Sequence, residues 1–153
     1  MAENWRRILV GLATAYAIGF LCIYLFPAIE STGPSIDRDI SSWVLRAAAF
    51  SSALAFIAYA VGGYIAREKF LLPAVVLELF TFTYGFLQGF SRSLDTLELW
   101  SEVGAYDFWQ IVIWPTLPLL VGPIAATAAG ALVGMKLYGV LKLRSIAIDS
   151  RST

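Results

Sequence analysis

The chain has no histidine and only one cysteine, and both shortages exclude classes of function. Without histidine there is no imidazole to act as a catalytic base, a metal ligand or a pH switch near neutrality. The lone Cys22 can form neither an internal disulfide nor a site of several cysteine ligands. Because it lies inside an apolar stretch, we expect it to be a small buried hydrophobe. The sequence therefore predicts no metal site and no cofactor.

Recognisable catalytic motifs are lacking as well. There is no glycine-rich phosphate loop, no nucleophile elbow and no metal-ligand spacing. The paired acids lie between apolar stretches, where solvated surface is their expected state and a loose cation contact the alternative: Asp37 with Asp39, and Glu98 with Glu102. The basic residues flank apolar stretches, a placement typical of membrane topology and anionic-lipid contact. We expect neither an enzyme nor a nucleic-acid-binding protein.

Long apolar stretches fill most of the chain. Hydrophobic residues make up 59% of it and charged residues 14%, against about 45–50% and about 25% in soluble domains. Four stretches reach the roughly 20 residues that a helix needs to cross a bilayer, at about 8–26, 43–66, 70–90 and 113–136, with short tails at 1–7 and 140–153. The first exceeds the usual apolar core of a signal peptide and lacks a small-x-small cleavage site, so we expect a retained helix. The sequence predicts an all-α integral membrane protein, residues 1–153 forming one compact bundle of four transmembrane helices.

The basic residues also predict the orientation. If both termini are cytoplasmic, eight of the eleven basic residues lie in the tails and the 67–69 turn. Acidic residues gather in the other two loops, at 27–42 and 91–107. The positive-inside rule therefore places both termini in the cytoplasm. The overall plan resembles small bacterial four-helix membrane proteins, so we expect the bacterial inner membrane.

The connections carry three further expectations. The short 67–69 turn predicts that the second and third helices form a tight antiparallel hairpin. The 91–107 loop is either a short helix on the membrane surface or a solvated acidic loop, and 108–114 either crosses the membrane or lies on it. Glycine-bearing runs at 60–63 and 132–134 suggest two parallel helical hairpins, as in some transporters, although any two helices rich in small residues would look similar.

Small residues recur at four-residue spacing in every predicted helix. Such ridges let helix backbones approach closely in lipid. The ridges consist of Gly11, Ala15 and Gly19; Ala47, Ser51 and Ala55; Thr81, Gly85 and Gly89; and Gly122, Ala126, Gly130 and Gly134. We expect them to hold the four helices together. A ridge left on the outside would form a homodimer or bind a larger membrane-protein partner.

Glu78 is the one ionisable residue deep inside a predicted span, about 12 Å from its cytoplasmic end at about 1.5 Å per residue. Placing it there costs about 2.5–3.5 kcal/mol on insertion scales, so it must face the bundle or water. Thr81 shares its helix face, and depth matching puts three hydroxyl residues at its level: Tyr16, Tyr59 and Thr127. A carboxyl among hydroxyls and hydrocarbon favours its protonated form. Glu78 is then either a hydrogen-bonded packing lock or a proton or cation site.

Two functional hypotheses follow. The first is a non-enzymatic accessory, scaffold or assembly subunit, because the chain is small and has packing ridges without catalytic groups. The alternative is a small dimeric proton- or cation-linked transporter or channel that uses Glu78.

Overall fold

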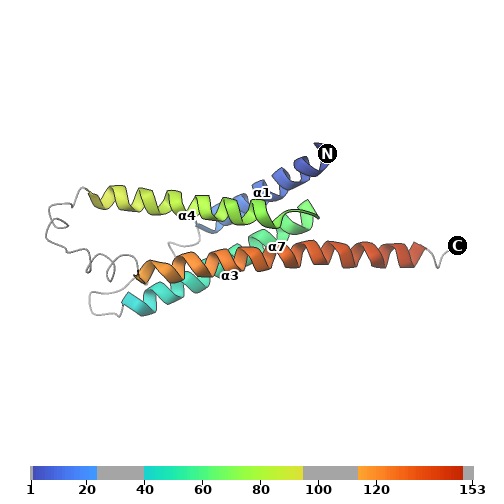
Figure 1. The fold of residues 1–153 in the computed structure, drawn as a ribbon. Coiled ribbons are helices and arrows are strands. Elements are labelled where there is room, and N and C mark those ends of the chain that lie inside the picture. Colours follow the sequence, from blue (N-terminus) through green and yellow to red (C-terminus); the bar gives the residue numbers. More distant parts are fainter. Residues whose placement is uncertain (1, 24–39, 95–113, 150–153) are drawn as a thin grey trace.

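The computed structural model describes residues 2–23, 40–94 and 114–149. Within these ranges all regular secondary structure is helical (Figure 1). Its four helices are α1 (Ala2–Ile23), α3 (Ile40–Ala66), α4 (Leu71–Leu94) and α7 (Trp114–Asp149). Within the described residues, the prediction of an all-α chain with four helices is confirmed. The loops expected at 27–42 and 91–107 are shorter than predicted, because residues 40–42 begin α3 and residues 91–94 end α4. The rest of both loops and residues 108–113 lie outside the described residues.

The helices extend further than the apolar stretches that predicted them. α7 continues to Asp149, well past the predicted end near residue 136, and α1 already begins at Ala2. Lys136, Lys142 and Arg144 end the apolar run but are good helix formers, so they do not end the helix. Hydropathy shows where the apolar run of a helix ends. The helix itself continues until a helix-breaking or capping residue stops it.

α3 and α7 form the centre of the bundle. They run in the same direction along their length (Figure 1), and each has an antiparallel neighbour, α1 on α3 and α4 on α7. α4 makes few contacts with α3, the helix that precedes it. The prediction of a tight hairpin between the second and third helices is therefore wrong. A short connection brings two helix ends together, but it does not decide which helix each one packs against.

The turn at 67–69 explains why α4 leaves α3. Arg67 and Lys69 both have left-handed backbones, with φ of 71° and 54°, a conformation that costs a side-chain-bearing residue about 1–3 kcal/mol. The Arg67 N–H donates to the Gly63 carbonyl at 2.9 Å, and this bond has the four-residue spacing of a helix and completes the last turn of α3. The chain then turns so that Phe70 points into the bundle, where it is fully buried.

Phe70 fills the space beside the crossing of α1 and α3. Its ring lies 6.4 Å from the Tyr59 ring, centroid to centroid. A Cβ added to Gly62 would meet it at 2.7 Å, and one added to Gly11 at 3.1 Å. α4 begins directly after Phe70, and Pro73 fits its first turn because the N–H that proline lacks has no helical partner there.

Small residues form the interior and large ones the exterior. Seven of the buried core residues are alanines: Ala15, Ala48, Ala55, Ala58, Ala66, Ala74 and Ala131. Large apolar side chains lie outside on every helix, among them Leu21 (65% exposed), Leu72 (73%), Phe80 (70%) and Leu143 (70%). A soluble protein buries such side chains, and contiguous exposed apolar surface marks contact with a membrane or a partner.

Two helical segments are long and apolar enough to cross a membrane, Leu45–Ala66 and Leu117–Arg144. Only 28% of the most apolar window of each is buried inside the protein. The core helix of a soluble protein of similar length would be mostly buried. Leu71–Gly85 in α4 is a shorter apolar helix, and the described part of α1 does not reach the same length and apolarity.

Candidate functional site

The structure brings Glu78 of α4 to Tyr59 of α3. Tyr59 is buried and Glu78 half-buried, and the Glu78 carboxyl lies close to the Tyr59 hydroxyl. Phe70 supports the Tyr59 ring from one side, and the fully buried Ala74, one turn before Glu78, holds α4 against the core. The one predicted intramembrane acid thus meets a hydroxyl on a neighbouring helix.

Thr127 of α7 is fully buried, and its hydroxyl has no hydrogen-bond partner. It differs in this from the other serines and threonines whose side chains are described. Each of those donates to the carbonyl four residues earlier: Thr14 to Val10, Ser51 to Ala47, Ser52 to Ala48, Thr81 to Leu77 and Thr83 to Leu79. The hydroxyl of Thr127 is therefore buried without a hydrogen bond, an arrangement that costs free energy of folding.

The contacts of α3 with α7 place Thr127 near the level of Tyr59. A Cβ added to Gly63 would lie 2.6 Å from the Ala131 carbonyl oxygen, so these two residues are in backbone contact. One helical turn back on both parallel helices leads from Gly63 to Tyr59 and from Ala131 to Thr127. Glu78, Tyr59 and Thr127, which come from three helices, therefore lie near one level of the bundle, and we refer to these three residues as the polar cluster.

Tyr16 and Thr81, the other two residues predicted for this cluster, lie elsewhere. Tyr16 is 55% exposed, since its neighbour Ala15 faces the core. Thr81 is exposed, and its hydroxyl donates to the Leu77 carbonyl at 2.9 Å. Counting residues from a membrane boundary estimates depth, but it does not show which way a side chain points.

The ridge of α7 contacts α3 along most of its length. A Cβ added to Gly130 or Gly134 would collide with the Phe56 or Ala60 carbonyl, and one added to Gly122 would lie 2.6 Å from the Ser52 hydroxyl. Ala126, the remaining ridge residue, packs against the core cluster. The ridge thus lets α3 and α7 approach to backbone contact.

Among the described residues, the ridge of α1 is occupied only near the 67–69 turn, and the ridge of α4 is exposed at Thr81 and Gly85. Gly11 and Ala15 are buried, but nothing described lies within 4 Å of a Cβ added to Gly19. On α4, Ala74 is buried, whereas a Cβ added to Gly85 also meets nothing within 4 Å. The side-chain surroundings of position 89, the remaining ridge glycine, lie outside the described part. Both ridges therefore have positions, Gly19 and Gly85, that no described residue contacts.

Two packing residues were not anticipated from the sequence. Gly62 meets Gly11, and Phe70 covers their crossing. The pair Gly62 and Gly63 was a usable signal, because adjacent glycines face different directions on a helix and let α1 and α7 approach α3 from two sides. Phe70 resembled the other phenylalanines of its apolar run, and nothing local distinguished it.

Within the described ranges, acidic and cysteine side chains do not gather in groups of three or more, as metal ligands would. Comparison with known protein families, with curated proteins and with solved structures found no match for this chain.

Proposed function

We propose that the chain is a four-span protein of the bacterial inner membrane with both termini in the cytoplasm. The arrangement of side chains by size supports this. Alanine and glycine occupy the helix contacts, and leucine, valine and phenylalanine point outward on all four helices. Lipid supplies the partner for such an exterior, and close backbone contact holds such an interior together. The pairing of α1 with α3 and of α4 with α7 is also what two parallel hairpins would produce.

Its function in this proposal is that of a non-enzymatic accessory or assembly subunit that binds another membrane helix. One observation carries this assignment, the open ridge of α4. Thr81 and Gly85 continue the face that Ala74 and Glu78 present to the bundle, yet they are exposed. In lipid, exposed small residues at four-residue spacing are the surface on which helices associate. A helix of a second copy or of a larger membrane protein would occupy the ridge.

The experiment is purification in mild detergent with measurement of the mass of the complex. We expect a homo-oligomer or a stoichiometric partner chain. Gly85→Leu should abolish the association, because leucine fills the ridge. Val76→Leu is the matched control, since it lies nine residues away on the opposite, exposed face of α4 and should leave the association intact. A strictly monomeric protein, or equal effects of the two variants, would contradict the proposal.

A second candidate function, a proton- or cation-linked transporter or channel, is favoured by the polar cluster. The hydroxyl of Thr127, which has no hydrogen-bond partner, belongs to α7, and the Tyr59–Glu78 contact joins α3 and α4 near the same level. An ion bound there would be held by oxygen ligands from three helices. Four helices do not enclose a path for an ion across the membrane, and dimerisation along α4 would complete one. Reconstituted protein should give a proton- or cation-dependent flux, and liposomes that stay tight under every imposed gradient would remove this function.

Thr127→Val tests the role of the orphaned hydroxyl because valine has nearly the same shape without the polar group. If the hydroxyl only fills space, the free energy of unfolding should rise by about 1 kcal/mol, since a buried unsatisfied group is removed. If it binds an ion, flux should fall while the protein stays at least as stable. Flux unchanged by the substitution would exclude Thr127 from the transport site.

A further inference from the structure

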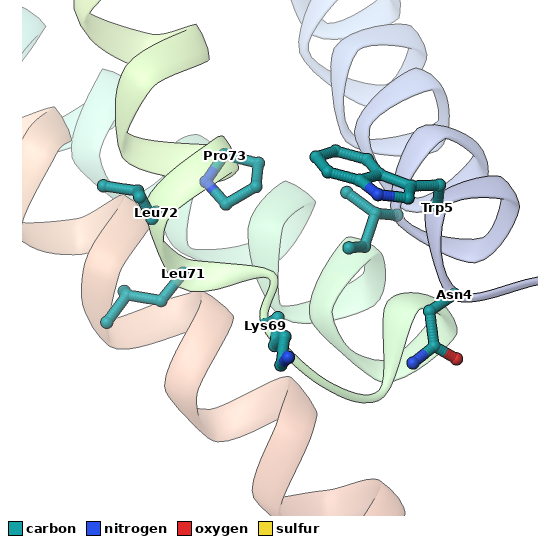
Figure 2. A pocket seen from close by; sticks show the side chains of 7 residues that line it. Asn4, Trp5, Lys69, Leu71, Leu72 and Pro73 are labelled. Atoms are coloured by element: carbon teal, nitrogen blue, oxygen red, sulfur yellow. The ribbon is translucent and has the colours of Figure 1, made fainter. Parts of the chain in front are cut away.

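A groove opens between α1 and α4 at the end of the bundle near the 67–69 turn (Figure 2). Its volume is about 600 Å³. Trp5 of α1 and Pro73 of α4 face each other across it, and Ile8, Leu71 and Leu72 complete an apolar wall. Asn4 and Lys69 lie at the end nearest the turn. In the proposed orientation this end faces the cytoplasmic surface of the membrane.

A second, polar pocket adjoins the groove and shares Asn4 with it. Its lining contains three basic side chains and one acidic one: Arg7, Arg67, Lys142 and Glu68. The Arg67 guanidinium lies over the Tyr138 ring, 4.5 Å from its centroid, and Arg7 forms an exposed ion pair with Glu3 at 2.5 Å. An apolar groove therefore continues into a pocket of net positive charge.

The backbone of the turn adds an independent observation. Arg67 and Lys69, which line the two cavities, are the two described non-glycine residues with positive φ. Glycine adopts this conformation without strain, whereas arginine and lysine do so at a cost. The positive-inside rule explains basic residues in this turn. It does not explain why they occupy the two positions with strained backbones. Strain of this kind is characteristic of binding sites.

We propose that the groove and the pocket together bind an anionic phospholipid of the cytoplasmic leaflet. The acyl chain lies between Trp5 and Pro73, and the phosphate lies among Arg67, Lys69 and Arg7, with Asn4 at the junction. The charge of the pocket selects anionic headgroups, and the apolar wall selects a lipid over a soluble phosphate. The site rests on the proposed membrane embedding and is separate from the open ridge of α4.

Quenching of Trp5 fluorescence tests the site directly, because Trp5 lines the groove. The other four tryptophans are replaced by phenylalanine, and the protein is reconstituted in phosphatidylcholine vesicles that contain a minor fraction of brominated lipid. Brominated phosphatidylglycerol should quench Trp5 more strongly than brominated phosphatidylcholine at the same fraction. Each basic residue near a membrane surface contributes roughly fivefold in affinity for anionic lipid. The double variant Arg67→Gly, Lys69→Gly should therefore lower the preference about 25-fold.

Glycine relieves the strain at both positions, so loss of the preference cannot be ascribed to a damaged turn. Lys136→Gln is the matched control, because Lys136 is an exposed basic residue that lines neither cavity, and it should leave the preference unchanged. Glycerol phosphate in excess should not relieve the quenching. Relief by glycerol phosphate would overturn the assignment to a lipid and identify a site for soluble phosphate.

Equal quenching by the two brominated lipids, with strong quenching by both, would overturn the lipid site but leave the membrane embedding intact. Absence of quenching by any lipid would overturn the embedding as well. Native mass spectrometry of the unmodified chain, released from mixed phosphatidylglycerol and phosphatidylcholine membranes, avoids the tryptophan substitutions. Retention of phosphatidylglycerol in preference to phosphatidylcholine is expected, and equal retention would contradict the site.

Discussion

Gly11 of α1 and Gly62 of α3 face each other where the two helices cross, with no side chain between them. A Cβ added to Gly11 would lie 2.6 Å from the Gly62 carbonyl oxygen, and one added to Gly62 would lie 2.7 Å from the Gly11 carbonyl oxygen. The contact is therefore reciprocal, and Phe70 packs beside it. Neither helix can accept a methyl group here unless the backbones separate.

Gly62→Ala should destabilise the protein by about 1–3 kcal/mol, the usual cost of overpacking a tight contact. Gly19→Ala is the control on α1, because nothing described lies near that position. It should be neutral or slightly stabilising, since alanine favours a helix by about 1 kcal/mol over glycine. Thermal unfolding in mild detergent measures both. Equal effects would show that α1 and α3 do not meet at this crossing.

Phe70 and Phe80 provide a comparison of one residue type in two surroundings. Phe70 is fully buried, and Phe80 is 70% exposed. We expect Phe70→Ala to lower the free energy of unfolding by about 2–3 kcal/mol, below the soluble-protein range because, in the proposed membrane embedding, the unfolded chain also lies in an apolar solvent. Phe80→Ala should change it by less than about 0.5 kcal/mol. A larger loss from Phe80→Ala would show that α4 packs through its outward face.

The strained turn predicts opposite effects of glycine at adjacent positions. Lys69→Gly should stabilise the protein by about 1 kcal/mol, because relief of the left-handed backbone exceeds the added entropy of the unfolded chain. Glu68 lies between the two left-handed residues without sharing their positive φ. Glu68→Gly should therefore cost about 0.5–1 kcal/mol. The melting temperature of each variant, compared with that of the parent protein, gives the sign of its effect on stability. Destabilisation by Lys69→Gly would contradict the strain at this position.

The sequence predicted the four helices because each apolar run is long and the chain has few residues that favour another structure. It did not predict their arrangement. The 67–69 turn suggested that α3 and α4 pair, whereas α4 packs on α7, because the left-handed residues and the inward Phe70 redirect the chain. Two left-handed non-glycine residues leave no pattern in the sequence from which they could have been predicted.

The candidate site was predicted in part for a similar reason. Depth along a helix follows from residue counting, so Tyr59 and Thr127 were placed near Glu78. The direction of a side chain depends on how the helix is rotated about its axis, and only packing decides that. Tyr16 was predicted at the same depth, but it faces outward because Ala15, beside it, faces the core. The ridges likewise identified which residues permit close contact, but not that Gly19 and Gly85 would remain open.

Three variants of Glu78 separate its two roles. If the carboxyl is a neutral packing group held by Tyr59, Glu78→Gln keeps the shape and a donor, so stability and function should survive, and Glu78→Ala should cost about 1 kcal/mol. If it carries a proton or cation, Glu78→Gln should abolish flux without loss of fold, because an amide does not titrate, and Glu78→Asp should retain part of it. Thermal stability and flux are measured side by side. Indifference of both to Glu78→Ala would show that the residue faces water.

Membrane embedding with both termini in the cytoplasm is the claim on which the proposals depend, and labelling of single cysteines tests it most directly. In a Cys22→Ser background, cysteines replace Glu68, Asp37 and Asp95 one at a time, and an impermeant thiol reagent is added to intact cells. We predict that Asp37→Cys and Asp95→Cys are labelled from outside, and that Glu68→Cys is labelled only after the membrane is opened. Labelling of Glu68→Cys in intact cells, or recovery of the protein in the soluble fraction, would contradict the account.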